Sequence, residues 1–487
     1  MKQSARTLIS LIPVVVLITL LAIHIGIYGA DAIMGASQVA LLASSGVCIL
    51  LGTIFFKTRW KAFESAIRNN FADVAGATLI LFLIGAVSGT WTMSGVVPAF
   101  IYYGVKIIGP KVFLVSACVI CAVVSLMTGS SWTTIATIGV ALLGIGRAEG
   151  FSDGLIAGAI ISGAYFGDKI SPLSDTTVMA SSVNKVPLFT HIRYMLFTTV
   201  PSMVIALILF TVIGLMHTGG GPVETELYST VLASNFTITP WLFIVPVLTL
   251  VLIARRVPAM PVLAISILVA AAAALLFQPG IIESIGAKIT EGSRARILLT
   301  GTVETVYNTV SLETGHPEVD GLLVTRGMVG MLNTVFLILC AMCFGACMQA
   351  SGMIANLARL LAPLTRTRTG LVASTVVTGT TLNGIVSDQY LAILLTSNIF
   401  GETYRGLGYE ERLLSRTVED SATVTSPLFP WGSCGMTQAT ILSVPTLTYA
   451  PYCFFNLISP LMSICIAAIG WKIVRPKPAA DAPVEND

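Results

Sequence analysis

Long apolar runs separated by short polar segments make up most of this chain. A membrane-spanning helix needs about 20 apolar residues, because each residue advances the helix by roughly 1.5 Å through a hydrocarbon core of about 30 Å. The pattern therefore predicts an all-α polytopic membrane protein with about 12–14 spans. The candidate spans are residues 7–29, 33–56, 74–94, 111–128, 131–147, 152–184, 194–216, 239–254, 257–278, 328–349, 370–383, 385–401, 415–436 and 449–471.

The composition supports the same fold class. Hydrophobic residues make up 55% of the 487 residues, only 10% are Asp, Glu, Lys or Arg, and the mean hydropathy is +0.88. A soluble domain carries about 25% charged residues, so this chain cannot coat a water-facing surface of ordinary size. The net charge of +3 gives no reason to expect a nucleic-acid partner.

The distribution of Lys and Arg predicts the orientation in the membrane. If the N-terminus is cytoplasmic, most of the 27 Lys and Arg fall in cytoplasmic loops, which agrees with the positive-inside rule. Both termini are then cytoplasmic, and the polar segment 279–327 is external or lies along the membrane surface. The tail at 472–487 contains three Pro and is expected to be disordered.

Two parts of the chain carry the same motifs in the same order. Thr128-Gly-Ser-Ser is echoed by Thr378-Gly-Thr-Thr, and the segment from Asp168 to a Ser-Pro pair is echoed by one from Asp420 to a second Ser-Pro pair. An odd number of spans separates the two units, so the second is predicted to be inverted. Inverted repeats with broken helices are typical of secondary transporters. The predicted organisation is an N-terminal scaffold at 1–73, a first repeat at 74–216 broken at 167–175, connecting helices and an external loop at 217–327, an inverted repeat at 328–471, and the tail.

Each predicted unit has a Thr/Ser/Gly tip between short apolar arms, at 128–131 and at 378–384. Arms of about sixteen residues reach roughly 24 Å, which suits re-entrant hairpins as well as ordinary turns between complete helices. At membrane depth such a tip would offer hydroxyl and carbonyl oxygens to a hard cation. The hydroxyl groups in question belong to Thr128, Ser130, Thr378 and Thr380.

The second irregular place in the first unit carries charge at membrane depth. Pro172 removes a backbone donor and disfavours helix at Ser171, so the span must break there. Asp168 and Asp175 flank the break, and charged groups inside a membrane almost always face a partner or a cavity. The alternative is a cytoplasmic loop in which Asp and Ser cap the neighbouring helices.

The second unit has its own acidic candidates. Asp388 lies five residues after Asn383 in an apolar span, and Glu419 and Asp420 precede the second Ser-Pro pair. For the latter two, a solvated helix end is the alternative, because Arg416 is close in sequence. A partly desolvated carboxylate can hold either a proton or Na⁺, and this competition by itself would couple the two fluxes.

At these motifs the chain resembles a known family. The segment from Gly167 to Thr177, GDKISPLSDTT, is similar to the signature of NhaC-type Na⁺/H⁺ antiporters of the ion transporter superfamily, as are 128–132, 387–390 and 419–431. The resemblance covers about residues 70–470. It implies a bacterial inner-membrane secondary transporter that exchanges Na⁺ for H⁺ by alternating access. Similar sequences also exchange malate for lactate or carry amino acids, so Na⁺/H⁺-coupled exchange of small organic substrates stays open.

Carried over by position, the resemblance places eight residues at the transport site: Asp168, Ser171, Asp175, Thr176, Asn383, Asp388, Glu419 and Asp420. From their chemistry, Asp168, Asp175 and Asp388 are the candidate Na⁺ ligands. The expected partners are Na⁺, protons, the lipid bilayer and, in the organic alternative, small carboxylates; a homodimer is left open. No cofactor and no enzymatic activity are expected.

Lys169 bears on the choice of substrate. It is the cation placed well within a predicted span, and a carboxylate substrate would need such a group. If Lys169 faces Asp168 it is occupied by that pair, which favours an inorganic substrate. An intramembrane aspartyl protease also needs two Asp, but Tyr165 stands where such enzymes usually carry Gly, and the Ser-Pro break disrupts the helix.

Overall fold

Helices supply all the regular structure in the described part of the chain. The computed structural model describes residues 3–28, 35–217, 222–255, 257–320, 323–358 and 367–473. Eight of its helices are long and apolar enough to cross a membrane, or up to ten if each of two bent helix pairs forms one span. The predicted polytopic α-helical class is therefore confirmed. Most of the tail predicted to be disordered, from residue 474 on, lies outside the described residues.

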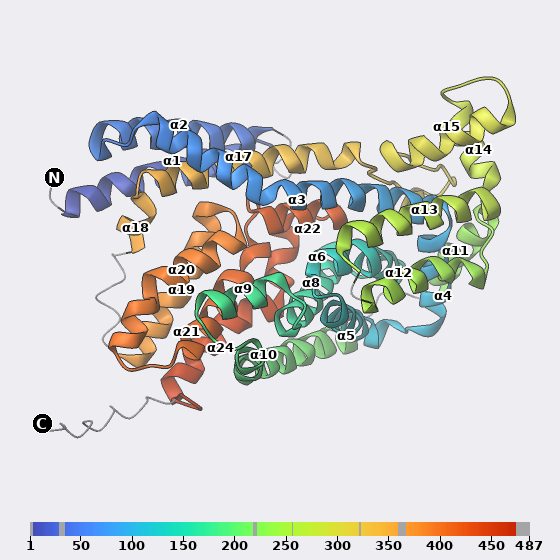
Figure 1. Cartoon of the computed structure of the whole chain (residues 1–487). Coiled ribbons are helices and arrows are strands. Elements are labelled where there is room, and N and C mark those ends of the chain that lie inside the picture. Colours follow the sequence, from blue (N-terminus) through green and yellow to red (C-terminus); the bar gives the residue numbers. More distant parts are fainter. Residues whose placement is uncertain are drawn as a thin grey trace, which may run out of the picture.

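The helices are arranged in two layers, which Figure 1 shows one above the other. In the upper layer α3 packs against α13, α15 and α17, and α17 also packs against α2. This layer contains α1 (Gln3–Tyr28), α2 (Ala36–Phe56), α3 (Trp60–Met93), α13 (Ala259–Phe277), α14 (Pro279–Ala287), α15 (Arg294–Tyr307), α17 (Leu332–Ala350) and α18 (Met353–Ala358). Part of the polar segment 279–327 thus forms helices, and α15 lies on α3 with the backbone of Thr305 against Gly89.

The lower layer holds most of the remaining helices. It contains α4 (Val96–Ile107), α5 (Pro110–Thr128), α6 (Ser131–Thr134), the π-helical turn η2 (Ile135–Gly139), α7 (Val140–Ala148), α8 (Asp153–Ile170), α9 (Asp175–Val183), α10 (Leu188–Met216), α11 (Pro222–Asn235), α12 (Ile244–Ala254), α19 (Arg368–Val386), α20 (Gln389–Gly406), α21 (Glu411–Val418), α22 (Ser433–Leu442) and α24 (Phe454–Ile469). Short helical turns join them: η3 (Pro240–Phe243), α16 (Pro317–Asp320), η4 (Val329–Met331), η6 (Glu419–Thr423), η7 (Ser426–Leu428), α23 (Thr446–Tyr449) and η8 (Ala450–Tyr452).

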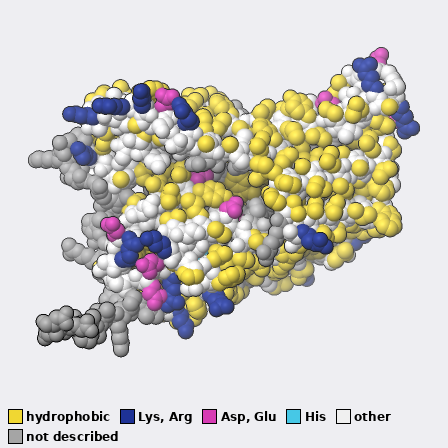
Figure 2. Space-filling model, in the orientation of Figure 1, with side chains coloured by type: hydrophobic (Ala, Val, Ile, Leu, Met, Phe, Trp, Pro, Cys, Tyr) yellow, Lys and Arg dark blue, Asp and Glu magenta, His cyan; other side chains and the backbone are white. Residues whose placement is uncertain are grey.

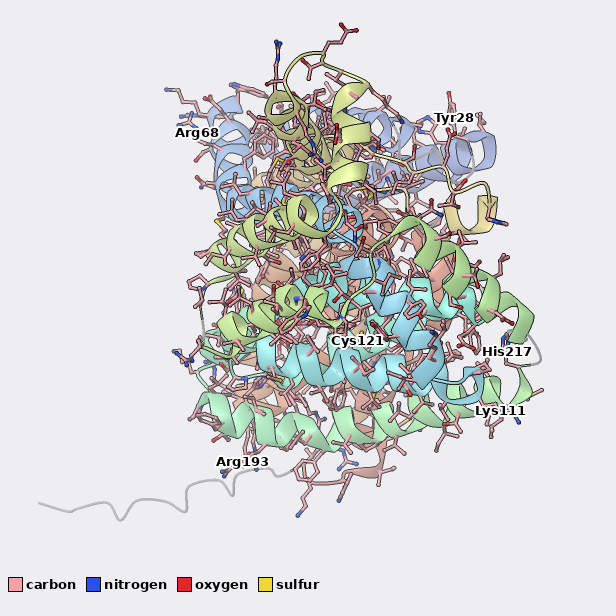
Figure 3. All side chains as sticks on the ribbon, turned by 90° about the vertical axis from the view of Figure 1, so that its right-hand side faces the viewer. Tyr28, Arg68, Lys111, Cys121, Arg193 and His217 are labelled. Carbon is pink, nitrogen blue, oxygen red and sulfur yellow. The ribbon has the colours of Figure 1, made fainter. Side chains whose placement is uncertain are left out.

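The surface has the polarity expected of a membrane protein. On the face shown in Figure 2, hydrophobic side chains form a broad continuous area, and Lys and Arg gather mainly at its left end. In Figure 3, Lys111 and His217 lie together at one edge, where α5 begins and α10 ends, whereas Cys121 of α5 is within the bundle. Charged groups near the helix ends and apolar groups between them allow the bundle to sit in a hydrocarbon layer.

The apolar core consists of two main clusters. One gathers side chains mainly from α3 to α8, among them Phe113 and Ile160, and the other gathers them mainly from α17 to α21, among them Phe344 and Ile393. Each predicted repeat thus contributes most of one cluster. The boundaries of the repeats, and the inversion of the second relative to the first, stay predictions.

Glycines bring α5 and α8 into direct backbone contact. A Cβ atom added at Gly163 would lie 2.0 Å from the carbonyl oxygen of Cys118, and one at Gly167 would lie 2.2 Å from that of Ala122. Both distances are far below van der Waals contact, so α8 approaches α5 more closely than any residue with a side chain would permit. This contact fixes the end of α8 that carries the predicted break.

We expect Gly163→Ala to destabilise the fold by at least about 2 kcal/mol, because the new methyl group meets backbone that cannot move aside alone. Thermal unfolding of the purified protein in detergent measures the effect. Gly46→Ala in α2 is the matched control, since a Cβ atom there meets no atom within 4 Å. Equal unfolding temperatures for the two variants would contradict the proposed role of the α5–α8 contact.

The first predicted tip is confirmed, and the second is displaced. Gly129 has a left-handed φ of 65°, and Ser130 then caps α6 by accepting a hydrogen bond from the backbone N–H of Thr133. In the second unit, α19 continues as helix through 378–384, so the prediction of a tip there is wrong. The chain turns instead at Ser387, with φ of 60°, and Asp388 caps α20. The Asp388 side chain accepts a hydrogen bond from a backbone N–H at the start of α20, and this stabilises the break at Ser387. The Thr and Gly residues at 378–384 do not produce a break by themselves.

Candidate functional site

A cavity of about 1070 Å³ lies between the two layers. From the upper layer it is bounded by parts of α3, α13 and α17, and from the lower layer by the α5–α6 turn, the α8–α9 break and the start of α20. In Figure 2, acidic side chains are visible in the hollow between the layers. The cavity is lined by six of the residues predicted from the sequence: Thr128, Ser130, Asp168, Asp175, Thr176 and Asp388.

Asp168 lies in the last turn of α8, where its side chain contacts the N-terminal end of α6. It is only 6% exposed. Its Oδ2 accepts two hydrogen bonds from Ser131, from the backbone N–H at 3.1 Å and from the hydroxyl at 2.7 Å. Ser131 begins the helical run α6–η2–α7, whose N-terminal end carries partial positive charge. This contact and the nearby Ser174 hydroxyl group fix the orientation of the carboxylate at the wall of the cavity.

The other two carboxylates lie at helix starts as well. Asp388 is 7% exposed, and its Oδ1 accepts a hydrogen bond of 3.0 Å from the backbone N–H of Leu391 in the first turn of α20. Asp175 begins α9 and is exposed toward the cavity that it lines. Each acidic group therefore sits where an N-terminal helix dipole offsets part of its negative charge.

The cavity is suited to a small cation. Carboxylate and hydroxyl oxygens are the ligands that hard cations prefer. Among the described residues, no Lys, Arg or His lines the cavity, so its electrostatic potential is set by three carboxylates. Because helix dipoles weaken that potential, a bound monovalent cation would be held without being trapped, as transport requires.

Several predicted site residues lie outside this cavity. The hydroxyl group of Ser171 donates to the carbonyl oxygen of Leu126, and the amide of Asn383 donates to the carbonyl oxygen of Ala422 and to Thr425. Both contacts stabilise the two breaks rather than provide free ligands. The cavity lining also excludes Thr378 and Thr380 on α19, and Glu419 and Asp420 on η6.

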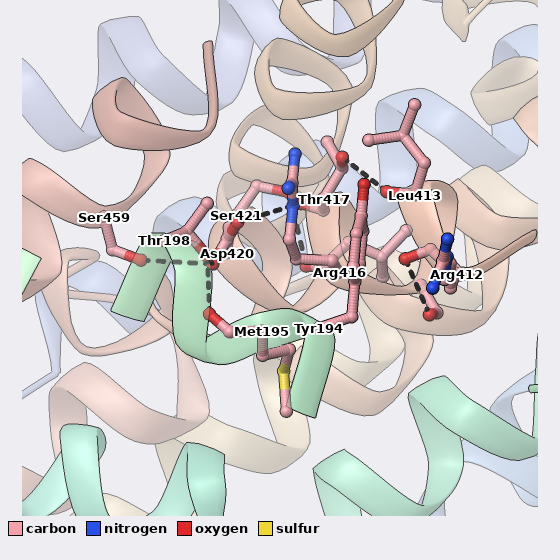
Figure 4. Close-up of polar contacts among 12 residues, drawn as sticks. Tyr194, Met195, Thr198, Arg412, Leu413, Arg416, Thr417, Asp420, Ser421 and Ser459 are labelled. Atoms are coloured by element: carbon pink, nitrogen blue, oxygen red, sulfur yellow. Dashed lines mark hydrogen bonds and ion pairs between the residues drawn. The ribbon is translucent and has the colours of Figure 1, made fainter. Parts of the chain in front are cut away.

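Asp420 is the centre of a second group of charged residues (Figure 4). Lys169 Nζ donates to its Oδ1, as does the Thr198 hydroxyl at 3.0 Å. Arg416 Nε lies 3.7 Å from its Oδ2, and the guanidinium is 4.8 Å from the Tyr194 ring. The side chains of Lys169, Arg416 and Asp420 are all 0% exposed.

This charged cluster changes two of the interpretations made from the sequence. Lys169 pairs with Asp420 and with Ser459, at 3.1 Å, and not with Asp168. The solvated helix end considered for Glu419 and Asp420 is also wrong, because Arg416 is fully buried with them. In sequence the two acidic residues and Arg416 look like an exposed helix end, whereas packing of α21 and η6 against α10, α19, α20 and α24 encloses them.

Sequence reasoning missed some of the residues that position these groups. Ser131 lay within the predicted tip, yet its contact with Asp168 depends on how α6 packs against α8. Thr198 and Ser459 lie on α10 and α24, which carry no motif at those positions. Hydroxyl groups in apolar spans were the available signal for both, but such groups are common in membrane helices.

Comparison with known proteins agrees with this geometry. A sequence profile of the Na⁺/H⁺ antiporter family matches residues 3–181 and 163–471. The Na⁺/H⁺ antiporter NhaC of Alkalihalophilus pseudofirmus is 38% identical over 427 residues, which is 87% of this chain and 89% of the relative. The malate-2H⁺/Na⁺-lactate antiporter of Bacillus subtilis is 36% identical, covering 89% of both chains. The arginine/ornithine antiporter ArcD of Halobacterium salinarum is 33% identical, covering 98% of this chain and 94% of the relative.

The family profile spans nearly the whole chain, including both breaks and every carboxylate of the cavity. The similarity to the NhaC protein extends over the same region at an identity well above that expected by chance. As the resemblance of the motifs implied, the chain belongs to the Na⁺/H⁺ antiporter family.

Proposed function

We propose that this protein exchanges Na⁺ for H⁺ across the bacterial inner membrane and that Na⁺ binds in the cavity between the two layers. Asp168, Asp175 and Asp388 supply the carboxylate oxygens, and nearby hydroxyl groups complete the ligand set. The observation that carries the proposal is the concentration of three carboxylates in one cavity whose described lining includes no basic side chain. Relative movement of the two layers would open the cavity to either side of the membrane in turn.

The orientation in the membrane is part of the same proposal. We place both termini in the cytoplasm, as the positive-inside rule predicts. In its support, α1 begins and α24 ends at the same end of the molecule, on the left of Figure 1. The main concentration of Lys and Arg in Figure 2 is at that end too.

Exchange of small organic substrates is the alternative, since two relatives are named for malate and lactate or for arginine and ornithine. A dicarboxylate would need a cationic partner, and Lys169 is enclosed by Asp420 and Ser459 outside the cavity. The geometry therefore favours Na⁺ over an anionic substrate.

Proton movement in proteoliposomes distinguishes these functions. With a pH-sensitive dye inside the vesicles and no organic substrate present, a gradient of NaCl should drive proton flux, whereas choline chloride should not. Flux that requires malate, lactate or arginine in addition to Na⁺ would assign the protein to organic exchange. Vesicles without protein give the background leak.

A further inference from the structure

We propose that Glu419 carries the exchanged proton, at a position beside the cation cavity and not within it. The inference rests on the proposed Na⁺/H⁺ exchange and assigns the two ions to different groups. Direct competition of Na⁺ and H⁺ for the same carboxylate, as inferred from the sequence, is the arrangement that it replaces. The argument begins with the unusual surroundings of the Glu419 side chain.

Glu419 and Asp420 are neighbours in the π-helical turn η6, and their environments differ sharply. Both are 0% exposed. Asp420 has Lys169, Thr198, Ser459 and Arg416 around it. Neither carboxyl oxygen of Glu419 makes a hydrogen bond of ordinary geometry in the described part of the chain, and only the hydroxyl groups of Thr176 and Thr423 act on it as weak donors. The wider π-helical turn directs the two side chains to different surroundings.

An unpaired, buried carboxylate is costly, because neither water nor a donor replaces its hydration. The neutral acid has a much smaller desolvation cost. In the conformation described here, Glu419 is therefore stable with its proton bound. Few buried acidic groups in proteins lack a well-formed hydrogen bond, and such exceptions call for a functional explanation.

Two charged groups of opposite sign act on Glu419. Lys169 is the one that favours its ionised form, but the Lys169 ammonium group is already shared with Asp420. Asp168, at the wall of the cavity, acts on Glu419 with the opposite sign. Arg416 on the preceding helix has Asp420 as its acidic neighbour. Ionised Glu419 would thus bear the cost of burial and the repulsion of Asp168, against an attraction to Lys169 that is shared with Asp420.

The remaining elements packed against η6 add few charges. The helix α24 contains no charged residue. The charged residue of α9 is Asp175, at the cavity, and that of α19 is Arg368, which is bonded to backbone oxygens of α24. On α20, Asp388 caps the helix at the cavity, and Glu402 and Arg405 are on the exposed surface. Of the three cavity carboxylates, Asp168 is the one whose charge acts on Glu419, so the protonation of Glu419 responds to whatever Asp168 binds.

This arrangement couples the two ions through electrostatics. When Na⁺ binds at Asp168, it cancels the charge that opposes ionisation of Glu419, so the proton is released. When Na⁺ leaves, the repulsion returns and Glu419 takes up a proton. Thr176 lies beside Glu419 and also lines the cavity, and its hydroxyl contacts that of Ser174 at 3.0 Å. These two hydroxyl groups form a polar connection between Glu419 and the cavity wall.

The substitution Glu419→Gln tests the assignment. In proteoliposomes we expect Na⁺-driven proton flux to fall to the background, while exchange of radioactive Na⁺ for unlabelled Na⁺ continues at a rate within about threefold of the unmodified protein. The apparent Na⁺ affinity should also lose most of its pH dependence. Glu402→Gln, the same change at an exposed position on α20, should leave both activities intact.

Four results would overturn the proposal: Na⁺-driven proton flux that persists in Glu419→Gln, loss of Na⁺/Na⁺ exchange in a folded variant, an unchanged pH dependence, or no coupled flux in Glu419→Asp. If Glu419→Gln does not fold, infrared difference spectra of the unmodified protein decide. Addition of Na⁺ should then remove the carbonyl band of a protonated carboxyl group, and absence of that change overturns the assignment. Absence of Na⁺-driven flux in the unmodified protein would instead refute the proposed function itself.

Discussion

Asp168→Asn should raise the Na⁺ concentration required for half-maximal exchange by about a hundredfold, corresponding to about 3 kcal/mol of lost interaction with the cation. Asn retains an oxygen that can accept from Ser131, so the backbone at the α8–α9 break should hold its position while one of three cavity charges disappears. The measurement is Na⁺-driven proton flux in proteoliposomes over a range of Na⁺ concentrations.

Asp153→Asn is the matched control for this variant. It makes the same chemical change at the opposite end of α8, where Asp153 pairs with Arg147 at 2.7 Å outside the cavity. We expect unchanged exchange in the control. Similar Na⁺ dependence in Asp168→Asn and the unmodified protein would remove Asp168 from the cation site.

Asp420→Asn should lower the free energy of unfolding by about 3–5 kcal/mol, because it removes the acidic partner of two fully buried cations. Lys169 would keep only neutral acceptors, the Asn amide oxygen and Ser459, and Arg416 would lose its acidic neighbour within 4 Å. Thermal or denaturant unfolding in detergent micelles provides the comparison with the unmodified protein.

The double variant Lys169→Met with Asp420→Leu distinguishes the cost of an uncompensated charge from the cost of lost packing. Replacing both charges by apolar groups removes the desolvation cost together with the attraction, so it should be much less destabilising than Asp420→Asn alone. If the double variant were the less stable of the two, the cost would come from lost packing and not from an uncompensated charge. Transport by the double variant is a separate measurement.

The sequence was informative wherever one residue type restricts the backbone. Pro172 together with two Asp correctly located the break between α8 and α9. Gly129 marked the first tip, where the turn requires a residue with a left-handed backbone conformation. The carboxylates of the cavity were also found, because charge inside an apolar span is rarely accidental. The helical fold class followed from the lengths of the apolar runs.

What could not be predicted depended on contacts between distant segments. Thr378 and Gly379 resemble the first tip, yet packing keeps α19 helical, and the turn forms at Ser387, a residue type that does not by itself indicate left-handed backbone. Likewise, Lys169 directly follows Asp168 in the sequence, and no motif indicates that its partner is Asp420. Its pairing with Asp420 results from the way α24 packs against both α8 and η6.

The glycine contact between α5 and α8 has a mechanical consequence. Backbone in contact with backbone leaves no flexible side chain to absorb a shift, so α8 cannot slide along α5 without a clash between Gly163 and Cys118. Lys169 links the same end of α8 to η6, and Ser459 links it to α24. A displacement that carries Asp168 must therefore carry these elements together, so α5, α8, η6 and α24 should move as one rigid unit during transport.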